Sequence, residues 1–264
     1  MANLAYPQLS SGAMVQYPLR KRRMIQSAVN TFADGSMITS NINANTQRVW
    51  ELSYTDLTNV DRAALQNLFV NCQGPLMPFV FIDPTENMLG NSSDLTSGAW
   101  MAAPLLSVTG GAPDPLGGNT AFTLVNDSQV DQQVSQTMTA PANFRYCFSL
   151  YAMAAVSTPF RLGLNTGASQ QSETFTATGN WLRVAAPLQL TDSETTFTAS
   201  IIVPAAQTVV TWGPQLEPQL SPSRYRATAS AGGVYQNAHF LGNSLTFESD
   251  APGLFSTVIS IETT

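Results

Sequence analysis

The feature that most constrains this chain is a long series of short apolar runs between residues 88 and 227. Apolar and polar side chains alternate at 144–150, 160–164 and 197–203, and glycine, proline and asparagine separate these runs from one another. A period of two is typical of strands with one buried face. Because no amphipathic helix interrupts the series, the stretch predicts one antiparallel β-sandwich of the jelly-roll type.

The residues before this stretch predict a small α+β unit. An extended arm over 6–19 leads to a hairpin over 24–39, and 48–54 alternates as a half-buried strand. A helix is predicted near 59–72, since its apolar residues fall on one face and Thr58 begins a capping box. Another strand is expected at 78–82.

The last forty residues predict a return to this first unit. Residues 227–233 are interpreted as a linker, and strands are expected at 244–248 and 255–261. Two strands cannot bury a face alone, so we expect them to complete the N-terminal sheet. The predicted organisation is thus mainly β: a ring-forming domain of 1–87 plus 228–264, with a sandwich inserted at 88–227. In the alternative, the last strands belong to the sandwich.

The charge distribution argues against nucleic acid as a partner. Only 11% of residues are charged, and the net charge is -6. Affinity for phosphates requires many clustered cations. One basic run exists, and it is either a solvated strand edge or turn, or an electrostatic patch that contacts an acidic neighbouring subunit. This candidate inter-subunit patch consists of Arg20, Lys21, Arg22 and Arg23.

Catalytic and metal-binding signatures are missing from the sequence. His239 is the single histidine, and neither Cys72 nor Cys147 has a partner at CxxC spacing. The glycine pairs at 110–111 and 117–118 are expected in loops without a following helix, which disfavours phosphate binding. Asp83 is interpreted as a strand terminator that caps the next turn. The sequence therefore predicts no enzyme, no cofactor and no metal site.

Two tryptophans are candidates for contact with a sugar. Trp100 and Trp181 lie in the sandwich region, and aromatic faces can stack on the apolar faces of pyranose rings. Tryptophan in a strand pattern is also a frequent core residue. Both interpretations stay open at this stage.

The sequence predicts no membrane span. The first seven residues lack the basic start and apolar run of a signal peptide, and no stretch approaches about 18 apolar residues. We expect synthesis in the host cytoplasm.

Two motifs at the ends of the sandwich region carry a family resemblance. The run 83–89, followed by 91–95 and Trp100, resembles the entry to jelly-roll modules of tailed-phage tail and fibre proteins. The exit Thr-Trp-Gly-Pro-Gln-Leu-Glu at 211–217, with Ser-Arg-Tyr at 223–225, is similar to the ending of the same modules. Such modules are carbohydrate-binding-like.

The flanking segments resemble the N-terminal domain of phage tail proteins of the distal-tail or baseplate type. The resemblance implies a virion structural protein that forms a closed ring, typically a hexamer, and connects the tail tube to the tip or fibres. The inserted module would face the host and could bind surface glycan. The alternative is a receptor-binding protein whose main task is adhesion to glycan, and a depolymerase or lysin is a remote third option.

Overall fold

The computed structural model describes residues 4–25, 27–41 and 47–263, which divide into two compact units. The sheet-helix unit takes in the N-terminal residues through Ser10, together with 15–81 and 235–264; the sandwich unit comprises 11–14 and 82–234. Within the described ranges the chain forms one α-helix and several antiparallel sheets. The predicted mainly β class is confirmed. Residues 1–3, part of the segment inspected for a signal peptide, lie outside these ranges.

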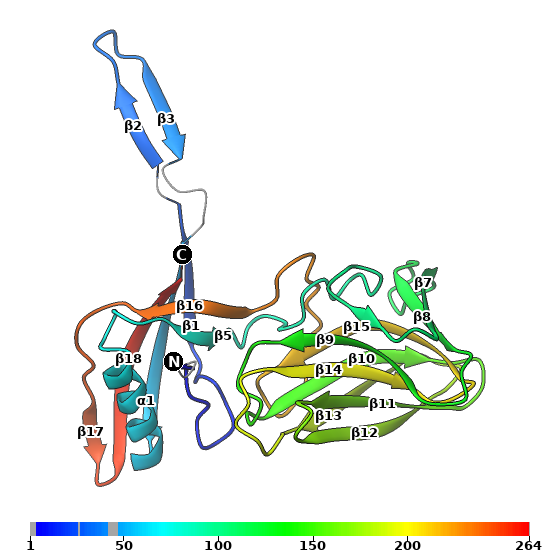
Figure 1. The fold of residues 1–264 in the computed structure, drawn as a ribbon. Coiled ribbons are helices and arrows are strands. Elements are labelled where there is room, and N and C mark those ends of the chain that lie inside the picture. Colours follow the sequence, from blue (N-terminus) through cyan, green and yellow to red (C-terminus); the bar gives the residue numbers. More distant parts are fainter. Residues whose placement is uncertain (1–3, 26, 42–46, 264) are drawn as a thin grey trace. The chain divides into compact units, whose positions relative to one another are not determined.

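The sheet-helix unit is built on one sheet with the strand order β1-β4-β18-β16-β5, and β17 pairs with β18 beside this path (Figure 1). A separate hairpin pairs β2 with β3. The bounds are β1 Leu19–Met24, β2 Ser27–Thr31, β3 Met37–Asn41, β4 Gln47–Leu57, β5 Phe79–Ile82, β16 Val234–Phe240, β17 Glu248–Ala251 and β18 Leu254–Thr263.

The C-terminal strand β18 completes the sheet that the N-terminal part of the chain begins. It pairs antiparallel with β4, so that Ile261 lies opposite Trp50 and Ile259 lies opposite Leu52. All four side chains are buried. The pairing is the one predicted for the last strands, and it follows from hydrophobic alternation in both segments, which places matching apolar faces on one side of the sheet.

Helix α1 runs from Asn59 to Asn71 and packs on this sheet. Its capping box is formed: the Asp61 backbone N–H donates to the Thr58 hydroxyl at 3.2 Å, and the Thr58 N–H donates to the Asp61 carboxylate at 3.3 Å. The ring of Phe69 meets that of Phe240 on β16 at 5.1 Å. The predicted helix is confirmed to within one residue at its end.

Two predictions in this unit differ from the structure in their bounds, and one strand was not predicted. Residues 234–240, for which no element was expected, form β16, because pairing with β18 outweighs a local sequence that lacks apolar alternation. The strand expected at 244–248 begins only at Glu248. The Thr257 hydroxyl donates to the Thr246 carbonyl at 2.6 Å, so a side chain satisfies that acceptor. The first strand of the hairpin, expected from Met24, is β2 and begins at Ser27, since Met24 ends β1, which pairs with β4.

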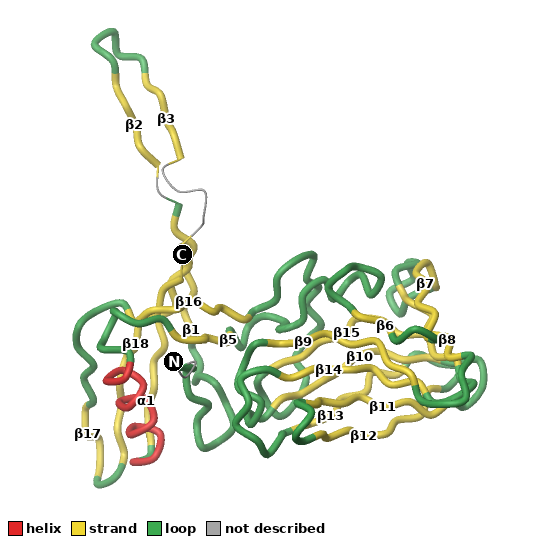
Figure 2. Tube along the Cα trace, viewed as in Figure 1, coloured by secondary structure: helices red, strands yellow, loops and turns green. Residues whose placement is uncertain are grey.

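The sandwich unit contains two five-stranded sheets that face each other, with the orders β13-β10-β15-β8-β7 and β12-β11-β14-β9-β6 (Figures 1 and 2). The bounds are β6 Met101–Ala102, β7 Leu106–Ala112, β8 Ala121–Asn126, β9 Gln132–Met138, β10 Tyr146–Met153, β11 Thr158–Asn165, β12 Gln170–Ala177, β13 Leu182–Leu188, β14 Phe197–Val203 and β15 Thr208–Glu217.

One loop prediction in the sandwich unit was wrong. Gly110 and Gly111 lie within β7, which pairs with β8, and the register shifts between Gly110 and Ala112. Gly111 has a φ of +91°, a conformation that glycine adopts without steric cost. The glycines therefore mark a β-bulge, where one extra residue is accommodated in the strand.

Asn87 joins the entry of the sandwich unit to its exit. This residue is fully buried, and its side-chain amide donates to the carbonyls of Pro214 and Arg226 at 3.0 and 3.2 Å. Its carbonyl oxygen accepts from the backbone N–H groups of Leu89 and Leu216 at 3.0 and 3.1 Å. Four backbone groups from three segments are thus satisfied by one side chain.

The same closure brings the two ends of the unit into direct backbone contact. The Gly233 N–H donates to the Asn87 carbonyl at 2.7 Å, and the Asp83 N–H donates to the Gly233 carbonyl at 2.8 Å. A Cβ atom added at Gly232 would lie 1.9 Å from the Met88 carbonyl oxygen, so only glycine permits this approach. Asp83 also accepts from the Thr85 N–H at 2.8 Å, which confirms its predicted turn-capping role.

We predict that Asn87→Ala lowers the free energy of unfolding of the sandwich unit by about 3 kcal/mol, because buried amide and carbonyl groups lose their partners. Urea unfolding followed by tryptophan fluorescence measures the change. Asn119→Ala, at an exposed position before β8, is the matched control. A loss below about 0.5 kcal/mol in Asn87→Ala would show that the closure does not depend on this side chain.

Candidate functional site

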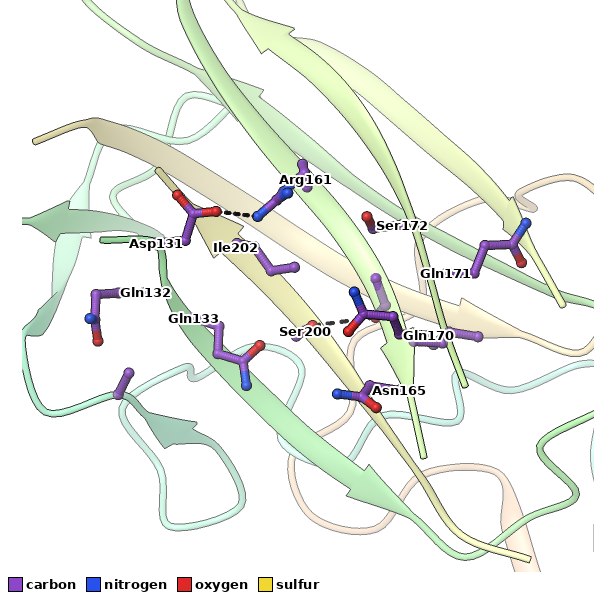
Figure 3. Close-up of a pocket in the computed structure, with 13 residues that line it drawn as sticks. Asp131, Gln132, Gln133, Arg161, Asn165, Gln170, Gln171, Ser172, Ser200 and Ile202 are labelled. Atoms are coloured by element: carbon purple, nitrogen blue, oxygen red, sulfur yellow. Dashed lines mark hydrogen bonds and ion pairs between the residues drawn. The ribbon is translucent and has the colours of Figure 1, made fainter. Parts of the chain in front are cut away.

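A cleft of about 380 Å³ lies on the outer face of the sheet β12-β11-β14-β9-β6. Side chains from β9, β11, β12 and β14 line it, and most of them carry an amide or a hydroxyl group (Figure 3). The amide side chains in the lining are Gln132, Gln133, Asn165, Gln170 and Gln171. Amides offer both donors and acceptors, so this surface can bind a ligand that presents both kinds of group.

The floor of the cleft is a row of small residues set by strand register. Ser172 lies opposite Gly163, and Gly163 lies opposite Ser200. Because neighbouring strands are about 4.8 Å apart, this row runs across the strands as a shallow channel. The channel therefore has a direction perpendicular to the strands.

Two flanking rows of larger side chains form the walls. On one side Ile202 lies opposite both Arg161 and Gln133, and on the other side Asn165 lies opposite both Gln170 and Thr198. Each wall is two residues from the floor along the strands, roughly 7 Å. The two rows are therefore about 14 Å apart along the strands, measured between backbone positions.

Gly163 keeps the floor open. A Cβ atom at this position would lie 3.3 Å from the Gln171 carbonyl oxygen and the Ser172 Cβ, and 3.4 Å from the Ile202 Cδ1. Any larger side chain would extend from there into the channel. The depth of the cleft therefore depends on glycine at position 163.

The electrostatic character of the cleft is set by one ion pair. Arg161 donates to the Asp131 carboxylate, and the two charges cancel. In the described part of the chain the Arg161 Nε is buried and has no hydrogen-bond partner. A buried donor without a partner is costly, so the ion pair with Asp131 must offset part of that cost.

The turn between β11 and β12 lies just beyond Asn165 and Gln170, and Asp192 accepts hydrogen bonds from two of its hydroxyls. The hydroxyls of Ser169 and Thr166 both donate to the Asp192 carboxylate, the latter at 2.6 Å. These hydrogen bonds hold the pKa of Asp192 below its ordinary value, since they favour the charged form. A second hollow of about 200 Å³ continues the polar surface past Asn165 to this turn.

We predict that Asp192→Ala increases amide hydrogen exchange in the turn at 166–170 at neutral pH. In the wild type, the carboxylate favours folding above its unfolded pKa of about 3.9. That contribution is lost as the pH falls through the lower folded pKa, so the turn should loosen only in acid. Exchange measured by mass spectrometry tests both statements, with the exposed Asp127→Ala as control; equal exchange in the two variants would contradict them.

The two tryptophans proposed for sugar stacking lie away from this cleft. Trp100 is 6% exposed, and its indole N–H donates to the Asn91 carbonyl at 3.1 Å. Its ring is part of the core and presents no face to solvent. Trp181 is half-buried in the segment before β13, in the other sheet, and does not line the cleft.

The basic run forms most of β1, at the edge of the sheet in the other unit. Its side chains are exposed; Arg20 pairs with Glu51 at 3.2 Å, and the Lys21 Nζ lies 5.5 Å from the centre of the Trp50 ring. The edge position agrees with the strand-edge interpretation of Arg20, Lys21, Arg22 and Arg23. Whether they contact another subunit stays a prediction.

Sequence reasoning missed the cleft because two of its strands have no clear apolar alternation. Strand β9 reads Gln-Gln-Val-Ser-Gln-Thr-Met and β12 reads Gln-Gln-Ser-Glu-Thr-Phe-Thr-Ala. The available signal was the repeated pair of glutamines, at 132–133 and 170–171. Paired amides at the starts of two strands mark a polar surface, but only the fold brings them together.

The groups with nucleophilic or metal-binding potential are engaged elsewhere. Burial raises the pKa of the Cys72 thiol to about 11 and that of Cys147 to about 12. His239 Nδ1 is 3.0 Å from the Pro75 carbonyl.

Among the residues described, no three His, Cys, Asp or Glu side chains form a cluster suited to a metal ion. No helix in the described part of the chain has the length and apolar character to cross a membrane.

Comparisons with known proteins give fold similarity only. No family model and no curated protein matches the chain. Among solved structures, the enzymatically active domain of tailspike protein 4 from bacteriophage CBA120 has a TM-score of 0.39 and 13% identity, and the match covers 52% of this chain and 22% of that domain. The chain therefore spans about a fifth of the tailspike domain.

Two carbohydrate-binding modules also resemble the chain. The C-terminal family 22 module of Clostridium thermocellum Xyn10B has a TM-score of 0.41 at 15% identity, covering 51% of this chain and 96% of the module. The CBM22-1 xylan-binding domain of Paenibacillus barcinonensis Xyn10C has a TM-score of 0.40 at 13% identity, covering 54% and 97%.

Proposed function

We propose that this chain is a non-enzymatic structural component of a tailed-phage tail whose sandwich unit binds an uncharged glycan chain in the cleft. The observation that carries the proposal is the register of the cleft, in which a floor of small residues lies between two rows of larger side chains, with amides in both rows. This geometry fits a polymer that lies across the strands.

The chemistry of the lining favours a polysaccharide over other polymers. Sugar hydroxyls donate and accept hydrogen bonds, as do the side chains of Gln133, Asn165 and Gln170. The single ion pair leaves the cleft without net charge, which gives no attraction for a polyanion such as a nucleic acid. Four strands contribute to the surface, so the channel is roughly 14 Å long between its outer strands.

The other unit supplies the features expected of an assembly domain. The hairpin of β2 and β3 exposes Val29, Met37 and Ile38 at 54%, 69% and 57%. Two strands alone have little stability, and exposed apolar patches of this kind are covered in assemblies. Together with the resemblance to distal-tail and baseplate domains, this supports a closed ring, a hexamer in our proposal, whose partners are further copies, the tail tube, and the tip or fibres.

The adhesion alternative has one specific observation in its favour, the cleft itself. If glycan attachment is the main task, the sandwich unit alone accounts for the function, and assembly serves only to display it. Ring formation by the chain and its incorporation into the tail distinguish the two roles.

We predict that Gly163→Val weakens glycan binding at least tenfold, because the added side chain fills the channel floor. Retention on insoluble and surface-coupled polysaccharides, followed by calorimetry with the one retained, measures the change. Ser107→Val, on an exposed position of the opposite sheet, is the control. Equal binding by both variants would exclude the cleft, and no binding by the wild type to any host surface glycan would exclude the function.

We predict that replacing all four basic residues of β1 with alanine reduces self-association most strongly at low ionic strength. Exposed charges interact over about 10 Å at 0.1 M salt and over shorter distances at higher salt, so the difference from wild type should shrink as salt is added. Sedimentation velocity at several salt concentrations measures it. Identical association of the two proteins at every concentration would remove these residues from the interface.

A further inference from the structure

A further hollow, different from the one beside Asn165, lies on the sheet β13-β10-β15-β8-β7 of the sandwich unit. It has a volume of about 160 Å³, and the rings of Trp212, Tyr225 and Phe122 line it together with the hydroxyls of Ser93 and Thr120. We refer to these five residues as the aromatic notch. None of them lines the cleft, so the two hollows are separate sites.

The strand pattern turns Trp212 outward. Its neighbours Val209 and Thr211 are fully buried in the sandwich, whereas Trp212 is half-buried on the opposite side of β15. Such outward positions on a wet sheet are usually polar. A large aromatic ring there exposes apolar surface to water, which is unfavourable. A ligand that covers the ring removes this unfavourable free energy.

Hydrogen bonds hold the rings of the notch in place. The Trp212 indole N–H donates to the Thr120 hydroxyl at 2.9 Å, and the Tyr225 hydroxyl lies 3.2 Å from the Ser92 hydroxyl. The two rings are 4.8 Å apart at an interplanar angle of 62°. The two rings therefore form a fixed corner. Because they are already immobilised, the binding of a ligand there costs little side-chain conformational entropy.

Gly213 allows the two rings of the notch to lie close together. It has a φ of +64°, and a Cβ atom there would lie 3.2 Å from two atoms of the Tyr225 ring. Glycine thus allows Tyr225 to lie against the backbone of β15. The corner depends on the Trp-Gly pair as a unit.

The aromatic surface continues from the notch across the sheet. Tyr151 lies opposite Trp212 in the strand register, with ring centres 5.4 Å apart, and Arg183 lies over Tyr151 at 5.6 Å. The row presents apolar ring surface bordered by one cation.

We propose that the aromatic notch binds a single pyranose residue, independently of the cleft. The C–H groups of the sugar would pack against Trp212 and Tyr225. Its hydroxyls would donate to the oxygens of Ser93 and Thr120 at the rim, whose own hydroxyl groups donate to the Thr228 carbonyl and the Asp114 carboxylate. The small enclosed volume suits one ring, whereas an extended peptide requires a longer groove. Binding of this kind, through one sugar ring, is expected to be of millimolar affinity.

The test is a titration of the isotope-labelled full chain with methyl β-glucopyranoside, methyl β-galactopyranoside and N-acetylglucosamine. The indole N–H signal of Trp212, identified by its loss in Trp212→Phe, should shift saturably with at least one of the three sugars. Ala227→Trp, an exposed substitution at the notch, should abolish the shift, and Ser93→Arg should do the same from the other side of the rim.

Gly163→Val distinguishes this proposal from that for the cleft. The Trp212 shift should persist in this variant, even if the cleft binds nothing. Absence of a shift with all three sugars would overturn the proposal, as would a shift that survives in both rim variants or disappears in Gly163→Val. A response to a proline-rich peptide without a response to sugar would also overturn it, because the notch would then recognise another class of ligand.

Discussion

The closure of the sandwich unit by Asn87 is the interaction on which the rest of the structure depends. One buried amide satisfies backbone groups of the entry, of β15 and of the exit segment, so a single polar centre holds both ends of the unit against β15, the strand that carries Trp212. Buried polar groups of this kind are stabilising only when every partner is present. The contacts of Asn87 are therefore structural, whereas Trp212 and Tyr225, which also belong to the exit motif, line the notch.

The two candidate surfaces illustrate different ways of building a site on a sheet. In the cleft, the small residues Ser172, Gly163 and Ser200 leave a channel between two rows of larger side chains. In the notch, by contrast, the large aromatic rings of Trp212 and Tyr225 lie on the outer side of the sheet, where polar side chains are usual. Both follow from the alternation of a strand, which leaves every second residue free of the core and available for function.

How far the sequence predicts this structure depends on the kind of signal. Hydrophobic alternation predicted β4 and β18, and the capping residues at Thr58 and Asp61 predicted α1, because each is a local expression of burial or hydrogen bonding. Strands β9, β12 and β16 carry weak alternation and form because their partners are already present. The cleft escaped prediction for the same reason: its residues come from four strands, and only long-range register places Gly163 beside Ser200. Trp100 and Trp181 attracted interest by residue type, which does not report burial.

The close approach at Gly232 has a consequence for how such a protein can change. Because the first and last residues of the sandwich unit lie against each other, its removal would leave two chain ends that a short turn could join. The sheet of the sheet-helix unit would keep its strand order, since β18 pairs with β4 whatever lies between them. The sandwich unit can therefore be exchanged for another domain near residues 82 and 234 while the pairing of β4 with β18 stays unchanged.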